Sequence, residues 1–310
     1  MVPEVGGSNP LDRPISLIHA RNWQQGCRPL IPKAKRPFPA VLLALDLAQW
    51  QSRGAGPCPV EKDPKFNNMH GFANPARFLR LARWLMPLLL GVGLVLAFGA
   101  LAWGLLMVPP DRLMGQTVRI LFIHVPCAWL GMAGWSTIAV SSLVELVWRH
   151  PLAAIAARAA AVPGAVFTAM CLITGSIWAR PTWGTWWVWD GRLTSYLILL
   201  FLYFGYIALA GAAQRDAAAG SGASRVTAIF GMVGAINIPI INRSVVWWNS
   251  LHQPASITLG KSAIDATFLW PLLIGALGFS CIFGGVVLAR MRTLLADIQA
   301  EARLRRKAMA

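Results

Sequence analysis

Residues 84–108 read WLMPLLLGVGLVLAFGALAWGLLMV, which is 25 consecutive residues without a charged side chain. At a helical rise of about 1.5 Å per residue, a segment of this length crosses a hydrocarbon core of about 30 Å. The chain of 310 residues is 56% hydrophobic and only 13% charged, far more apolar than one soluble core requires. Further apolar segments follow at residues 121–144, 159–179, 193–213, 226–242 and 266–289. The sequence therefore predicts an all-α, polytopic membrane protein with six transmembrane helices.

The basic residues predict how these helices are oriented, because lysine and arginine collect in loops that stay in the cytoplasm. Of the 28 lysines and arginines, 22 precede the first segment or follow the second, fourth or sixth. Arg77, Arg80 and Arg83 lie directly before the first segment, where this rule is strongest. Both termini are therefore expected in the cytoplasm. The net charge of +16 is explained by this orientation and by contact with anionic lipid, and no folded basic motif predicts nucleic-acid binding.

Composition divides the chain into three regions. Residues 1–75 are rich in proline, glycine, arginine and lysine, which predicts a disordered N-terminal extension. Residues 76–290 contain the six apolar segments, and residues 291–310 form a basic cytoplasmic tail that we expect to be an amphipathic helix. Met69 leads directly into the arginine-rich flank of the first segment, so we take it as a hypothetical natural start, testable by N-terminal sequencing. The five cysteines form no CxxC pair, which disfavours thiol redox chemistry.

The residues most typical of a binding site gather in the outer loops. The second of these loops, residues 180–192, contains the stretch Trp183-Gly-Thr-Trp186-Trp187-Val-Trp189-Asp190. Trp183, Trp186, Trp187 and Asp190 are spaced i, i+3, i+4 and i+7, so a helix would present three indoles and the carboxylate on one stripe. Such a stripe is typical of a platform for a flat, largely apolar ligand.

Two histidines lie on the same outer side. His124 begins the second apolar segment, two residues before Pro126. His252 follows Trp247 and Trp248 in the third outer loop, residues 243–265. Either histidine alone has an ordinary explanation: His124 can bond a backbone carbonyl left open by Pro126, and loop histidines are common. Together, two neutral imidazoles can supply both axial positions of a haem iron. The candidate platform for the porphyrin is then Trp183, Trp186, Trp187, Trp189, Asp190, Trp247 and Trp248.

Charged residues in the outer loops have alternative roles. Asp190 either caps a helix or accepts a hydrogen bond from the N–H of a ligand histidine. Arg180, Arg192 and Arg243 are candidate partners of haem propionates, because a guanidinium binds a carboxylate through two parallel hydrogen bonds. Each arginine alone is equally well explained as an interfacial side chain that extends its charge to the headgroups.

Catalytic motifs are missing from the sequence. Gly260-Lys261-Ser262 ends like a phosphate-binding loop, but the glycine that this motif requires at position 255 is Ala255. The sequence also contains no HExxH motif, and it shows no catalytic triad or paired carboxylates placed for acid–base chemistry. We therefore expect a binding protein without enzymatic activity.

Three stretches together carry a family resemblance: FIHVP at residues 122–126, WGTWWVWDGRLTS at 183–195 and WWNSLHQP at 247–254. Over residues 69–305 the sequence resembles the CcmC family, the haem-handling proteins of bacterial system I cytochrome c maturation within the tryptophan-rich superfamily. The resemblance implies that haem b binds non-covalently and transiently at the periplasmic tryptophan-rich loop, with His124 and His252 as axial ligands. The N-terminal extension departs from the family pattern.

The resemblance also implies a place of action and a set of partners. It implies the bacterial inner membrane, with both termini cytoplasmic and the haem site periplasmic, and delivery of haem to the chaperone CcmE. The small protein CcmD and the ABC transporter CcmA/CcmB are implied as further partners. Two other functions stay open from the residues: a redox subunit that holds haem or quinone permanently, and a membrane subunit of a non-haem transporter. The first would favour histidine pairs at several depths, and the second a polar path through the spans, where Glu145 is nearly alone.

Overall fold

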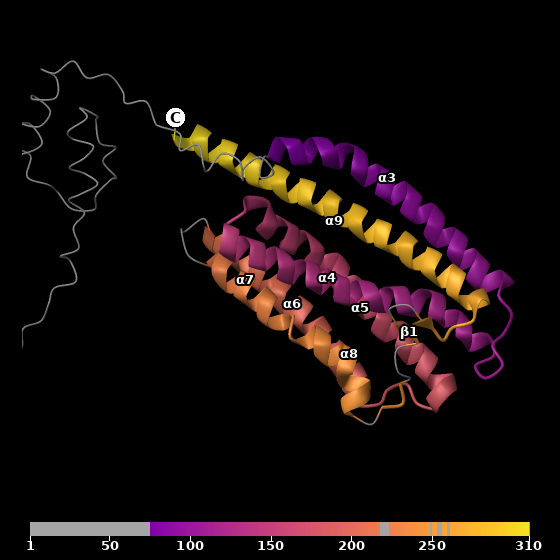
Figure 1. Ribbon diagram of the computed structural model, residues 1–310. Helices are drawn as coiled ribbons and strands as arrows, with labels where there is room; N and C mark the ends of the chain where they lie inside the picture. The colour runs from indigo at the N-terminus through magenta and orange to yellow at the C-terminus, as the bar shows by residue number, and fades with distance from the viewer. Residues whose placement is uncertain (1–74, 218–222, 249, 253–255, 259–260, 310) are drawn as a thin grey trace, which may run out of the picture. The chain divides into compact units, whose positions relative to one another are not determined.

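The computed structural model describes residues 75–309 except 218–222, 249, 253–255 and 259–260 (Figure 1). The predicted disordered extension and the hypothetical start at Met69 lie outside these residues. Within the described part of the chain, six helices are long and apolar enough to cross a membrane. They are Ala76–Met107, Gln116–Trp148, Pro151–Trp183, Gly191–Ala213, Arg225–Trp247 and Ala266–Ala308. The predicted all-α, six-span fold is confirmed.

Most spans consist of one continuous helix. The first is α3 (Pro75–Ala102), which ends in a π-helical turn, η1 (Trp103–Met107). A 3-10 turn, η2 (Gln116–Ile120), leads into α4 (Leu121–Trp148), and α5 (Pro151–Trp183), α6 (Gly191–Ala217) and α9 (Ala266–Met309) form the third, fourth and sixth spans. In the loop before α9, two-residue strands β1 (Ile257–Thr258) and β2 (Lys261–Ser262) pair antiparallel, with Ile257 opposite Ser262. The expected helix in the C-terminal tail is present, because α9 continues to Met309.

The fifth span is broken into α7 (Ala223–Gly234) and α8 (Asn237–Trp247). Pro239 has no N–H to donate to the carbonyl of Ala235, which instead accepts a tight bond from Ile238 N–H at 3.1 Å. Asn237 is buried at the break, and its side-chain amide donates to the carbonyl of Ser195 on α6 at 2.9 Å. This bond ties the start of α8 to α6, so that α8 carries the third outer loop toward the beginning of α6.

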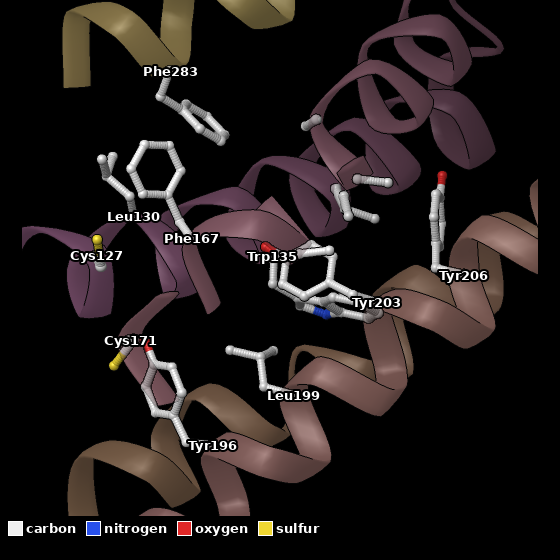
Figure 2. Close-up of a cluster of buried hydrophobic side chains, with 14 of the residues drawn as sticks. Cys127, Leu130, Trp135, Phe167, Cys171, Tyr196, Leu199, Tyr203, Tyr206 and Phe283 are labelled. Atoms are coloured by element: carbon white, nitrogen blue, oxygen red, sulfur yellow. The ribbon is translucent and has the colours of Figure 1, made fainter. Parts of the chain in front are cut away.

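The core lies between α4, α5 and α6 and is aromatic (Figure 2). Trp135 of α4 packs edge-to-face against Tyr203 of α6, with ring centroids 5.0 Å apart. The Tyr203 hydroxyl donates to the carbonyl of Gly131 at 2.7 Å. A Cβ atom at Gly134 or Gly164 would overlap this hydroxyl, so both glycines are needed for the close approach of the helices. The three helices therefore form a fixed frame, and one end of this frame carries His124, the end of α5 and the start of α6.

Helices α3 and α9 run side by side along one flank of this frame (Figure 1). Glycines allow a close approach of the two helices: a Cβ atom at Gly93 would lie 2.9 Å from the Gly278 carbonyl oxygen. Near the start of α3, Met291 and Leu295 of α9 pack with Leu152 and Ile155 of α5 in a second apolar cluster. The α3–α9 pair is thereby attached to the frame through α5.

Candidate functional site

The tryptophan-rich stretch is an irregular connection between two helices. Gly184, with φ 78°, adopts the left-handed conformation that ends α5, and its N–H bonds the carbonyl of Arg180 at 3.1 Å. At the other end, Asp190 caps α6 by accepting the Leu193 N–H at 2.8 Å. Residues 184–190 are not helical between these two signals. The expectation that Trp183, Trp186, Trp187 and Asp190 share one helical stripe is therefore wrong.

Asp190 joins this connection to the third outer loop. Its Oδ2 atom accepts a hydrogen bond from His252 Nδ1 at 2.7 Å and another from the Ser250 hydroxyl. The same hydroxyl accepts the His252 N–H at 3.1 Å, which closes a small ring of bonds around the carboxylate. The Asp190 side chain is only 3% exposed. Both roles considered for Asp190 therefore apply, because one carboxylate caps a helix and also orients a histidine.

These contacts set the charge states of the pair. Burial alone would raise the pKa of Asp190, but hydrogen bonds from Ser250, Leu193 N–H and His252 outweigh it and lower that pKa. Burial lowers the pKa of His252 below its ordinary value of 6.5, although Asp190 opposes this shift. His252 is therefore a neutral imidazole at neutral pH, with its proton on Nδ1 facing the carboxylate. The lone pair of its Nε2 atom is left available.

His124 is also bonded through its Nδ1 atom, but its partner is a neutral hydroxyl instead of a carboxylate. Its Nδ1 atom lies 3.0 Å from the hydroxyl oxygen of Thr174 on α5. That hydroxyl already donates to the carbonyl of Met170 at 2.7 Å, so it accepts the proton of His124 Nδ1. This contact takes the place of the bond to a carbonyl freed by Pro126, which was one of the two alternatives for His124. In His124, as in His252, the lone pair remains on Nε2.

Both imidazoles contact the last turns of the same helix. His124 packs edge-on against Trp178, with ring centroids 5.7 Å apart, and His252 packs against Trp183 at 4.8 Å. Five residues of α helix separate these two tryptophans, an axial distance of about 7.5 Å. The two imidazoles therefore lie against neighbouring turns at one end of α5. The fold thus brings together two histidines that lie more than a hundred residues apart in the sequence.

The predicted platform tryptophans differ in exposure. Trp186, Trp189, Trp247 and Trp248 are between 52% and 75% exposed, whereas Trp183 and Trp187 are half-buried. Trp248 packs closely against Gly191, where a Cβ atom would lie 2.8 Å from the indole. The indole N–H groups of Trp178 and Trp187 are buried and have no acceptor among the described residues. The site therefore offers apolar ring surface together with two unused donors.

The three candidate arginines are placed differently. Arg180 is exposed and donates to the carbonyl of Gly184, so it secures the end of its own helix. Arg243 is exposed on α8, one turn before Trp247. Arg192 is half-buried at the start of α6, and its charge acts on both His124 and His252. Of the three, Arg192 is the one whose charge bears on the pKa of His252.

Several contributing residues do not stand out in the sequence. Thr174 and Trp178 contact His124 from a different helix, which no local spacing predicts. Gly175 leaves room for the ring, because a Cβ atom there would lie 2.9 Å from His124 Cε1. Ser250 carries a weak signal, since a serine two residues before a histidine can bond its backbone N–H, as it does here.

Comparison with known proteins places this arrangement in a family. Residues 68–306 match the family model described as heme exporter protein C. The chain is 50% identical over 224 residues to heme exporter protein C of Bradyrhizobium diazoefficiens, covering 71% of this chain and 82% of that protein. It is 40% identical to the Escherichia coli K12 protein of the same name, over 74% of this chain and 91% of that one. For the Rhodobacter capsulatus protein the identity is 36%, over 77% and 98%. This chain belongs to the heme exporter protein C family.

Proposed function

We propose that this protein binds haem at the periplasmic end of its helices, between His124 and His252, and delivers it to a CcmE-like chaperone during c-type cytochrome maturation. One observation carries the proposal: both imidazoles lie at one end of α5, and both hold their Nδ1 proton in a bond to the protein. Two neutral Nε2 lone pairs are what axial ligation of a haem iron requires.

The two ligands would differ in strength. A carboxylate that accepts the Nδ1 proton raises the basicity of the imidazole and holds its orientation, whereas a hydroxyl does so more weakly. His252 is therefore expected to be the stronger donor, although it lies in a loop. His124 is held between α4 and α5, where Gly175 and Trp178 contact its ring.

The exposed indoles favour transient binding. Covering roughly 300 Å² of porphyrin at about 25 cal/mol per Å² contributes about 7 kcal/mol, and association itself costs about 4 kcal/mol or more. The surface alone would hold haem loosely, so iron ligation sets the residence time. The sequence contains no CxxCH motif for covalent attachment, which agrees with non-covalent haem b as a cargo.

The propionates would be bound by a cation and by indole donors. Arg192 is the best placed of the three candidate arginines, because its charge reaches both imidazoles. The buried N–H groups of Trp178 and Trp187 can donate to carboxylates at the same end of the bundle. Arg180 and Arg243 are left to the rim of the site.

The proposal includes a location and partners. We place the protein in the bacterial inner membrane with both termini cytoplasmic, as the 22 basic residues on one side favour. It would act as an assembly and transfer factor with CcmD and with the ABC transporter CcmA/CcmB, which would supply ATP hydrolysis.

Visible spectroscopy of the protein purified in detergent tests the proposal. We expect a low-spin haem spectrum that disappears in the double variant His124→Ala with His252→Ala. His150→Ala is the matched control, because His150 caps the opposite end of α5 by accepting the Leu152 N–H at 3.3 Å. Colourless protein from haem-replete cells would overturn the proposal. Haem that cannot be trapped on a co-purified chaperone would instead favour a permanent redox subunit.

A further inference from the structure

A groove opens between the start of α3 and the second half of α9. It has a volume of about 440 Å³ and is lined by Leu79, Met86, Ala289, Arg292, Thr293 and Ala296. It lies beyond the tight contact between Gly93 and Gly278, toward the start of α3. With one arginine and a largely apolar lining, the groove suits an amphipathic ligand.

The opposite face of α9 fixes the direction in which the groove opens. Met291 and Leu295 are buried against Leu152 and Ile155 of α5, so this face of α9 points into the protein. Thr293 and Ala296, which line the groove, are exposed. The groove therefore opens to the surroundings of the bundle and not into its core.

The depth of the groove matches a bilayer surface. Met86 lies inside the charge-free segment 84–108, and Ala289 is the last residue of the apolar segment 266–289. Arg292 and Thr293 come one turn after this end, where a membrane helix passes from hydrocarbon into the headgroup layer. Met86 and Ala289 thus lie at the depth of acyl chains, and the guanidinium lies at the depth of phosphates.

The Arg292 guanidinium is a strong hydrogen-bond donor, but the group that it contacts is a weak acceptor. Its guanidinium contacts the thioether sulfur of Met86 at 3.5 Å, and no carboxylate contacts it among the described residues. By contrast, Arg290 bonds the Ala159 carbonyl at 3.1 Å, and Arg305 is paired with Glu301 at 3.9 Å. Arg83, which shares a helical stripe with Leu79 and Met86, adds a second exposed cation beside the groove.

We propose that this groove is a binding site for an anionic phospholipid. The headgroup phosphate binds the Arg292 guanidinium, and an acyl chain lies over Met86 and Ala289. Basic pockets between transmembrane helices at a membrane surface have the chemistry that anionic headgroups require. The bound lipid fills the seam between α3 and α9 where these helices separate, and so stabilises the attachment of α3.

Native mass spectrometry of the delipidated protein tests this site with phosphatidylglycerol, and with phosphatidylcholine as the lipid that lacks net charge. We expect Arg292→Gln to weaken phosphatidylglycerol binding about fivefold, as the loss of one cation near a surface predicts. Arg303→Gln, an equal loss of charge on the exposed end of α9, should leave binding unchanged. Ala289→Phe keeps every charge and fills the groove, so it should also reduce binding.

The alternatives give different results. Equal retention of phosphatidylglycerol by all three variants would overturn the proposal, since it would mean a non-specific lipid layer. Displacement of the lipid by inorganic phosphate alone would show an anion site without acyl recognition, and would also overturn it. In native membranes, a photoreactive benzoylphenylalanine at position 296 should gain the mass of a phospholipid. A gain the size of a protein would mean that a partner helix occupies the groove.

Discussion

Replacing Asp190 by asparagine should separate haem binding from folding. Asparagine caps helices as well as aspartate does, so its carbonyl can still accept the Leu193 N–H that begins α6. Its amide NH2 then faces His252 Nδ1, where the carboxylate oxygen accepts a proton at 2.7 Å in the native protein. A donor in this place forces the imidazole proton from Nδ1 to Nε2. Nε2 then carries the proton and has no lone pair with which to bind iron.

Rotating the asparagine side-chain amide by 180° does not remove this conflict. If its carbonyl faces His252, its NH2 faces the Leu193 N–H, and a buried donor without an acceptor costs about 1–3 kcal/mol. Loss of the partner that orients a metal-binding histidine typically reduces metal affinity about 10–100-fold, which is about 1.4–2.8 kcal/mol. We therefore expect haem affinity to fall by one to two orders of magnitude while the helix content stays the same.

Haem titration followed by absorbance measures this change, and circular dichroism measures folding. Asp111→Asn is the matched control, because one oxygen of Asp111 accepts both the Leu113 and Met114 N–H groups, at 2.9 and 2.8 Å. An asparagine can keep both of these bonds, so this variant should bind haem normally. If Asp190→Asn binds low-spin haem as tightly as the native protein, the assigned role of Asp190 is wrong.

Three further predictions concern the imidazoles. Thr174→Val removes the acceptor of the His124 Nδ1 proton and should weaken haem binding about tenfold, whereas Thr174→Ser should restore it; equal titrations for both variants would contradict this. Gly175→Ala should displace His124 and reduce the low-spin band, whereas Gly99→Ala, where nothing lies within 4 Å, should not. The lowered pKa of His252 favours the neutral imidazole at pH 6.5, so the low-spin band should persist down to that pH and fall only with further acidification. A loss that begins above pH 6.5 would show that another group controls release.

The spans could be predicted because their signals are local. Apolar length alone placed all six, and the fifth, predicted as the short segment 226–242, extends over Arg225–Trp247 in the structure. Its break at Ala235 and Ile236 went unpredicted. Pro239 is the local signal for it, but a proline in the first turn of a helix and a proline that interrupts a helix look alike in sequence. The orientation of the spans stays a prediction, because it depends on charge and on a membrane.

The sequence predicted which residues belong to the candidate site, but it did not predict the hydrogen bonds between them. Histidines and tryptophans in outer loops stand out by type, so His124, His252 and the tryptophan-rich stretch could be named. Thr174 could not be named, because a threonine in an apolar helix is ordinary until another helix places an imidazole 3.0 Å away. Side chains on different helices can be paired in many ways, and no local spacing in the sequence indicates which pairs form.

The error about the tryptophan stretch shows what the site requires. The i, i+3, i+4, i+7 spacing is real, but Gly184 and Asp190 are the end and start signals of two different helices. If residues 183–190 continued as a helix, Asp190 would bond within that helix and could not cap α6. Its carboxylate would also leave the third outer loop, and Ser250 and His252 would lose the group that holds them. The break in the helix is therefore the feature that turns a row of indoles into a site with an oriented histidine.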